Sequence, residues 1–206
     1  MTIKLKGSVG GSVSFVAPSN TSPSGTAVSL TLPTSAGSNG QYLQTNGSDT
    51  LSWQSVNTVS VAVLVDEKAQ NTSGGTFTAG DWRTRDLNTE VSDPDGIATI
   101  SSNQFTLGAG TYLIYWECPA YAVDRHQSRL FDVTGTSEVE VGTSSYARNS
   151  DNGACISPGA VIVNPSANNV YEIQHRAETT MAGFGFGVES NFGSEHYTRV
   201  TIYKIA

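Results

Sequence analysis

The chain has 206 residues, enough for one large all-β domain or for one ordinary domain with an additional segment. Hydrophobic residues make up 37% of it and charged residues only 14%, and the 21 glycines with abundant Ser, Thr and Asn favour turns and short strands over long helices. The net charge of −7, from 11 scattered basic and 18 acidic side chains, excludes the positive patch that nucleic-acid binding requires.

Residues 1–57 are expected to form an extended arm with short strands. Alternating apolar residues bounded by Gly, Pro or Asn-Gly predict strands of a few residues, and the Asn-Gly pairs at 39–40 and 46–47 predict tight turns. Such a polar segment buries too little apolar surface to offset its chain entropy, so we expect another protein or a second copy to hold it. The predicted strands are 12–16, 28–33, 42–44 and 51–53.

The apolar side chains of this arm are the expected contacts with a larger particle. They are spaced along a segment whose only charged residues are Lys4, Lys6 and Asp49. We therefore expect an anchor formed by Ile3, Leu5, Phe15, Leu30, Leu32 and Trp53.

Residues 58–206 have the pattern of a second, globular domain. Many short apolar runs follow one another at near-regular spacing, with no helical pattern between them, which predicts a β-sandwich or jelly roll. The last run extends almost to the C-terminus and is expected to lie centrally in a sheet, because terminal residues fray unless they are held. The predicted strands are 59–65, 97–100, 104–107, 111–118, 129–133, 139–141, 160–163, 169–175 and 196–205.

The run 111–118 is apolar on both faces of a strand. One face can pack in the core of the sandwich, but the other then needs a partner outside the subunit. We expect the core and the contact between subunits to be formed by Tyr112, Ile114, Trp116, Val200, Ile202 and Tyr203.

The segment from about Val59 to Ile205 resembles the C1q/TNF-like jelly rolls, and in particular a branch found in structural proteins of phages and large viruses. Ser101–Tyr112 resembles the strand–turn–strand signature in which a Gly-x-Tyr step opens a long central strand. The arm segment Leu32–Trp53 resembles the attachment segments of phage fibres and virion-surface proteins. Further similar stretches are Trp82–Thr89, Pro119–Thr134, Gly142–Ala147, Tyr171–Thr180, Gly183–Val188 and Tyr197–Ile205.

The resemblance implies a homotrimer whose arm anchors to other virion proteins, of the capsid or the tail, and whose head faces outward. The resemblance implies no catalytic residues. No stretch approaches the roughly 20 apolar residues of a membrane helix, and no signal peptide follows Met1. The expected location is therefore the virion, with synthesis in the host cytoplasm, release by lysis and no membrane insertion.

The residues that could carry catalysis or bind metal have no suitable spacing. His126, His175 and His196 lie in or beside three different predicted strands without a metal-binding motif, so we expect hydrogen bonds made locally or at the subunit interface instead. Cys118 and Cys155 favour two buried thiols over a disulfide. No cofactor is expected, and the only ion left open is a structural calcium, as occurs in some C1q-like trimers.

Four side chains are candidates for facing a ligand: Trp82, Arg83, Tyr121 and Tyr146. They lie in predicted loops or strand ends, where aromatic rings beside polar groups suit sugar stacking or protein contacts. The alternative is that the aromatic rings simply pack against neighbouring loops.

Two non-enzymatic functions fit these features. The first is a short virion fibre or knob whose trimeric head binds a glycan or protein of the host surface. The second is a capsid decoration protein whose arms staple neighbouring subunits of the shell. An enzyme such as a depolymerase is disfavoured, because glycoside hydrolysis needs paired carboxylates in a groove and charged residues are sparse.

Overall fold

The computed structural model describes residues 2–6, 12–16, 29–56 and 58–205, with side chains from residue 29 onward. All regular structure in this part of the chain is β, as predicted. Among the described residues, no helix could span a membrane. The chain divides into two compact units, Met1–Val56 and Asn57–Ala206, each of which is described by itself.

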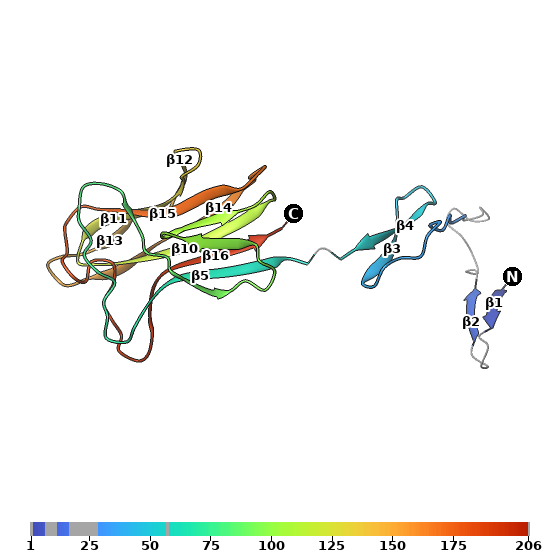
Figure 1. Cartoon of the computed structure of the whole chain (residues 1–206), viewed down its shortest axis with the longest axis horizontal. Coiled ribbons are helices and arrows are strands. Elements are labelled where there is room, and N and C mark those ends of the chain that lie inside the picture. Colours follow the sequence, from blue (N-terminus) through green and yellow to red (C-terminus); the bar gives the residue numbers. More distant parts are fainter. Residues whose placement is uncertain (1, 7–11, 17–28, 57, 206) are drawn as a thin grey trace. The chain divides into compact units, whose positions relative to one another are not determined.

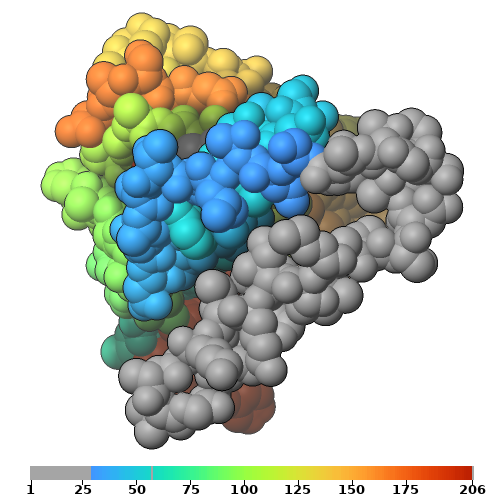
Figure 2. Space-filling view, turned by 90° about the vertical axis from the view of Figure 1, so that its right-hand side faces the viewer, coloured from blue at the N-terminus to red at the C-terminus, as the bar shows by residue number. Residues whose placement is uncertain are grey.

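The first unit contains two hairpins. Strands β1 (Thr2–Lys6) and β2 (Ser12–Val16) pair antiparallel, with Ile3 opposite Phe15. Strands β3 (Gln41–Thr45) and β4 (Leu51–Ser55) form the second hairpin. Most of the residues from 29 to 56 are exposed, and they form the blue and cyan surface in Figure 2.

The tight turn at 39–40, just before β3, is confirmed, since the Gln41 amide donates to the Ser38 carbonyl oxygen at 3.1 Å, whereas β3 and β4 are joined by a longer loop over residues 46–50 in place of the tight turn predicted at 46–47. Gly40 and Gly47 adopt φ values of 82° and 79°, a region that suits glycine. The predicted strand at 28–33 is wrong over its described residues, where Thr31 makes only an isolated bridge with Thr50. Leu32-Pro33 explains the difference, since proline has no amide hydrogen with which to extend a ladder.

The second unit, the head, is a sandwich of two antiparallel sheets (Figure 1). The five-stranded sheet has the order β14 (Ala154–Val163), β10 (Tyr112–Tyr121), β16 (Glu195–Lys204), β5 (Ser60–Lys68) and β7 (Thr89–Ser92). The seven-stranded sheet has the order β12 (Ser137–Val141), β11 (Asp124–Asp132), β15 (Asn169–Ala177), β9 (Gln104–Leu107) and β8 (Ala98–Ser101), with β13 (Ser145–Ala147) beside β11 and β6 (Arg83–Thr84) beside β15.

The chain passes back and forth between the two sheets. It crosses at β9–β10–β11 and again at β14–β15–β16, which is the winding of a jelly roll. The last strand, β16, lies between β10 and β5 in the middle of its sheet, as expected. The sequence therefore predicted both the sheet class and the place of the terminal strand.

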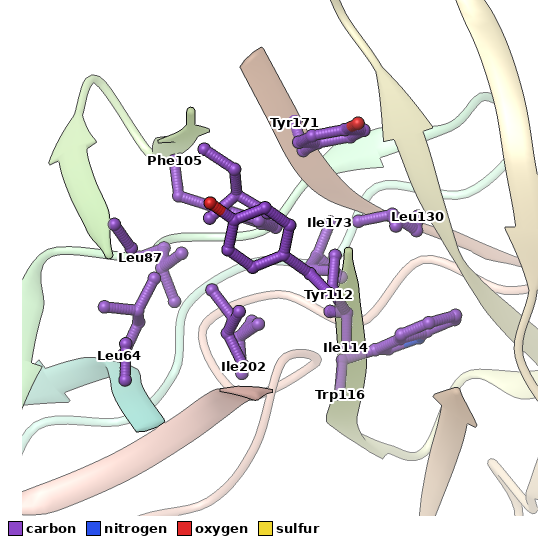
Figure 3. Close-up of a cluster of buried hydrophobic side chains, with 14 of the residues drawn as sticks. Leu64, Leu87, Phe105, Tyr112, Ile114, Trp116, Leu130, Tyr171, Ile173 and Ile202 are labelled. Carbon is purple, nitrogen blue, oxygen red and sulfur yellow. The ribbon is translucent and has the colours of Figure 1, made fainter. Parts of the chain in front are cut away.

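The core lies between the sheets and follows the alternation of each strand (Figure 3). On β10, Ile114 and Trp116 point inward and are at most 1% exposed, and they meet Leu130 and Ile173 of the other sheet. The indole nitrogen of Trp116 donates to Ser128 Oγ at 2.8 Å. Each such side chain contributes about 1.5–3 kcal/mol by leaving water.

Strand β14 begins earlier than the sequence indicated. The expected strand starts at residue 160, whereas β14 starts at Ala154 and includes Pro158-Gly159. Those two residues are typical of a turn, but β14 is an edge strand, where a proline removes no ladder hydrogen bond. Gly159 is required there, because a Cβ at this position would lie 2.0 Å from the Trp116 ring.

Candidate functional site

The residues expected at the core and subunit contact separate onto two faces of one sheet. Five of them are at most 1% exposed and belong to the core of their own subunit: Tyr112, Ile114, Trp116, Val200 and Ile202. Tyr203 lies on the opposite face, because successive side chains of β16 alternate. Contact with another copy would therefore fall to the alternate positions of these strands.

The outer apolar face of the five-stranded sheet is formed by those alternate positions. The strand register places Leu113 of β10 between Ile162 and Tyr203, and Tyr115 is 46% exposed with its ring edge-on to that of Tyr203, 6.1 Å between centroids. A hollow of about 670 Å³ opens on this face. The apolar side chains that form the face are Val59, Leu113, Tyr115, Ile162, Tyr203 and Ile205.

A second hollow, of about 740 Å³, lies on the seven-stranded sheet and brings together two of the candidate ligand-facing residues, Trp82 and Tyr146. We call it the aromatic–arginine hollow. Its lining includes two aromatic residues, three charged residues and one amide, namely Trp82 and Tyr146, Arg125, Arg176 and Glu178, and Gln127.

The strand register explains this grouping. Arg125 of β11 lies opposite Tyr146 of β13, and Gln127 lies opposite Arg176 of β15, so all four side chains leave the same face of the sheet. Arg125 Nη1 is 2.7 Å from Glu178 Oε1. The hollow is therefore assembled on paired strands, which hold its side chains in fixed relative positions.

Trp82 is held by a charged network that the sequence did not reveal. The guanidinium of Arg129 lies 4.1 Å from the centroid of the Trp82 ring and 4.9 Å from that of Phe131. Arg129 donates through Nε and Nη2 to Gln174 Oε1, at 2.8 and 2.6 Å, and through Nη1 to Glu138 at 2.9 Å. One ring face of Trp82 is thus fixed against a cation.

The other two ligand candidates lie elsewhere. Arg83, on β6, donates through Nε to the carbonyl oxygen of Thr78 at 3.3 Å and does not line the hollow. Tyr121, at the end of β10, lines a separate hollow of about 460 Å³ together with Cys155 and Tyr197. The prediction thus grouped four residues of which the structure brings two together.

Two of the three histidines meet in the interior of the head. His126 Nδ1 lies 2.9 Å from His175 Nε2, and neither remaining ring nitrogen has a hydrogen-bond partner among the described residues. Burial, with the positive charge of Arg85 as the second cause, lowers the pKa of His126 to about 4 and that of His175 well below its usual value. His196 stands apart, 3.8 Å from Glu67.

Arg85 is a buried cation that the sequence did not single out. It donates to Thr198 Oγ1 at 2.8 Å and to the carbonyl oxygens of Pro119 and Phe186 at 3.2 and 3.1 Å. Its guanidinium also lies 4.2 Å from the centroid of the Phe186 ring. The sequence did not predict this burial, because arginine side chains are usually exposed.

The described residues contain no group of three metal-binding side chains. Both side-chain oxygens of Asp93, in the turn at residues 93–96, accept hydrogen bonds from the backbone amides of Ile97 and Ala98 at 2.9 and 2.8 Å. Cys118 and Cys155 are free thiols, but only Cys118 is buried, whereas Cys155, also expected to be buried, is partly exposed. Burial raises the pKa of Cys118 to about 11. A buried thiol of this kind is a poor nucleophile.

The expected anchor residues divide between exposed and folded positions. Leu30 and Leu32 are 57% and 66% exposed. Trp53 is partly covered, since its indole nitrogen donates to the Ser35 carbonyl oxygen at 2.9 Å and its ring lies against Gly37. The side chains of the other three, Ile3, Leu5 and Phe15, lie outside the described part of the chain.

No protein-family model matches the sequence, and no curated protein matches it significantly. Among solved structures, the chain is similar to murine APRIL at pH 5.0, with 10% identity over 71% of this chain and 99% of that one and a TM-score of 0.48. The globular domain of zebrafish complement 1qA has 15% identity over 72% and 98%, with a TM-score of 0.46. PRD1 vertex protein P5 has 16% identity over 83% and 85%, with a TM-score of 0.47.

These likenesses concern the fold alone. The strand order of the head, in two antiparallel sheets, is that of a jelly-roll sandwich.

Proposed function

We propose that this chain is a non-enzymatic structural protein of a tailed-phage virion. It forms a short trimeric fibre or knob on the particle surface, with its first unit anchored to another virion protein and its head directed at the host surface. The observation that carries the proposal is the outer apolar face of the five-stranded sheet, which the chain leaves uncovered among its described residues.

An uncovered apolar face of a sheet favours association with further copies. Tyr115, Ile162 and Val59 are 46%, 54% and 55% exposed, although each lies beside other apolar side chains. Removing such surface from water stabilises an assembly by about 25 cal/mol per Å². Three copies around one axis would cover the face in every subunit, and three linked heads would strengthen the binding of a weak surface ligand.

The first unit supports an anchoring role. It exposes Leu30 and Leu32, and Tyr42 and Leu43 of the β3–β4 hairpin are a further 45% and 42% exposed. Apolar side chains on a small polar unit gain stability by docking on a larger protein. The same exposure also favours the second candidate function, a decoration protein that staples neighbouring capsid subunits.

The test of the trimer is the mass of the full-length protein by sedimentation velocity. We expect three chains per particle, and we expect Tyr115→Glu to dissociate them because it places a charge in the buried contact. Tyr146→Glu is the matched control, since Tyr146 is 51% exposed on the other sheet. A wild-type protein that sediments as a folded monomer, or a Tyr115→Glu variant that remains trimeric, would contradict the proposal.

A further inference from the structure

The lining of the aromatic–arginine hollow has the chemistry of a sugar-binding site. Two aromatic rings, of Trp82 and Tyr146, line it together with the Gln127 amide and the hydroxyls of Ser144 and Ser145. Sugars combine apolar C–H faces, which stack on aromatic rings, with hydroxyls that need donors and acceptors close by. A hollow of about 740 Å³ has the volume of a small-molecule site.

One of the two rings of the lining is held in place before any ligand arrives. The Arg129 guanidinium covers the Trp82 ring and is itself fixed by Gln174 and Glu138. A ring that is already positioned loses little conformational entropy on binding, so Trp82 can contribute most of its contact energy. Tyr146 is 51% exposed and lies on β13, paired with β11, so its ring is accessible to the same ligand.

The charge of the hollow differs in sign from that of the whole chain. Two guanidiniums, Arg125 and Arg176, line it with a single carboxylate, Glu178, although the chain carries a net charge of −7. Arg125 is paired with Glu178, whereas Arg176 has no carboxylate partner among the described residues. An exposed arginine beside an amide and aromatic rings is suited to a bidentate contact with a planar anion such as a carboxylate.

We propose, resting on the host-surface role above, that the aromatic–arginine hollow binds a saccharide that carries a carboxylate, such as a uronic or sialic acid. The sugar ring stacks on Trp82 and Tyr146, and Arg176 receives its carboxylate. Gln127, Ser144 and Ser145 form hydrogen bonds with its hydroxyls.

The test is an array of oligosaccharides of uronic and sialic acids, each printed beside its methyl ester, in which a methyl group replaces the negative charge. Full-length protein is expected to bind one or more acids at least about ten-fold more tightly than the matched ester, since a charge-assisted pair is worth that factor. Arg176→Gln should remove the preference for the acid, and Tyr146→Ala should weaken binding of both members. Arg148→Gln, an exposed arginine outside the hollow, should change neither.

Equal binding of acid and ester, binding that survives both hollow variants, or no binding to the array would overturn the saccharide assignment. Sedimentation of the same samples keeps this result separate from the proposed function. A trimer that ignores every sugar would refute the ligand alone, whereas a monomer would refute the trimeric virion role.

Discussion

His126 and His175 show how two ordinary side chains become a buried neutral pair. They are 49 positions apart, but both point inward from neighbouring strands, where His126 lies opposite Ala177 and Ser128 opposite His175. The sequence predicted hydrogen bonds made locally or at the subunit interface, whereas these two rings bond to each other within the head. The pairing itself needed the register of β11 with β15, which the strand pattern does not fix.

This pair predicts a loss of stability on acidification. Its pKa values are lowered in the folded state, to about 4 for His126, so the unfolded chain binds protons first as the pH falls below about 6.5. Stability should therefore fall between about pH 6.5 and 4, by on the order of 3 kcal/mol for His126 alone. Urea unfolding at several pH values measures this slope.

The source of the slope is tested by removing both imidazoles. Replacing His126 and His175 together by Gln should flatten the slope. Hydrogen bonds from Asn149 and Ser190 amides lower the pKa values of Asp124 and Glu195, but their stabilisation is lost only as the pH falls below the usual carboxyl range. A slope that is the same in the double variant would mean that the pair is not its source.

At the scale of elements, strands with an alternating or continuous apolar pattern were predictable and strands without one were not. Strands β8 and β9 were predicted because alternating residues flank a turn in which Ser102 and Asn103 adopt positive φ values of 54° and 63°. Strands β6 and β13 contain two and three residues and carry no periodicity of their own. They form because neighbouring strands offer them hydrogen bonds, which is tertiary information.

The contact between β14 and β10 gives a test at this scale. Gly159→Ala should destabilise the head by about 1–3 kcal/mol, because the added methyl group overlaps the buried Trp116 ring. Urea unfolding measures the change, and Gly193→Ala, with open space around it, should have little effect. Trp116→Phe should recover part of the loss in the double variant if the ring is the cause.

At the scale of the whole molecule, the sequence predicted two parts of different character and a jelly-roll head. It also predicted one set of residues for both the core and the contact between subunits, whereas the structure places the members of that set on two different faces of the sheet. Which face meets another copy depends on the direction of each side chain, and the composition of a doubly apolar strand such as β10 does not specify it. The attachment of the first unit stays a prediction.

Leu30 and Leu32 give the test of attachment. The double change Leu30→Asp and Leu32→Asp should abolish co-sedimentation of the full-length protein with its particles and leave the trimer intact, because charges replace the exposed apolar side chains. Val91→Asp, at a side chain 52% exposed in the head, is the control. Retained co-sedimentation would remove these leucines from the anchor.

The copy number on intact particles separates the two candidate functions. A fibre or knob should match the few positions of a tail or of the vertices, whereas a decoration protein should match the capsid lattice. Quantitative mass spectrometry against the major capsid protein measures this ratio.

The free border of β14 has a consequence for crowding. Pro158 has no amide hydrogen, its carbonyl oxygen accepts from the Thr143 amide at 2.7 Å, and the Ile156 carbonyl oxygen accepts from Ser145 Oγ at 2.7 Å. Around residues 156–158, the hydrogen-bonding groups that a foreign strand would need are therefore absent or already used within the chain. We expect this part of the border to disfavour edge-to-edge pairing of copies that are held at high local concentration.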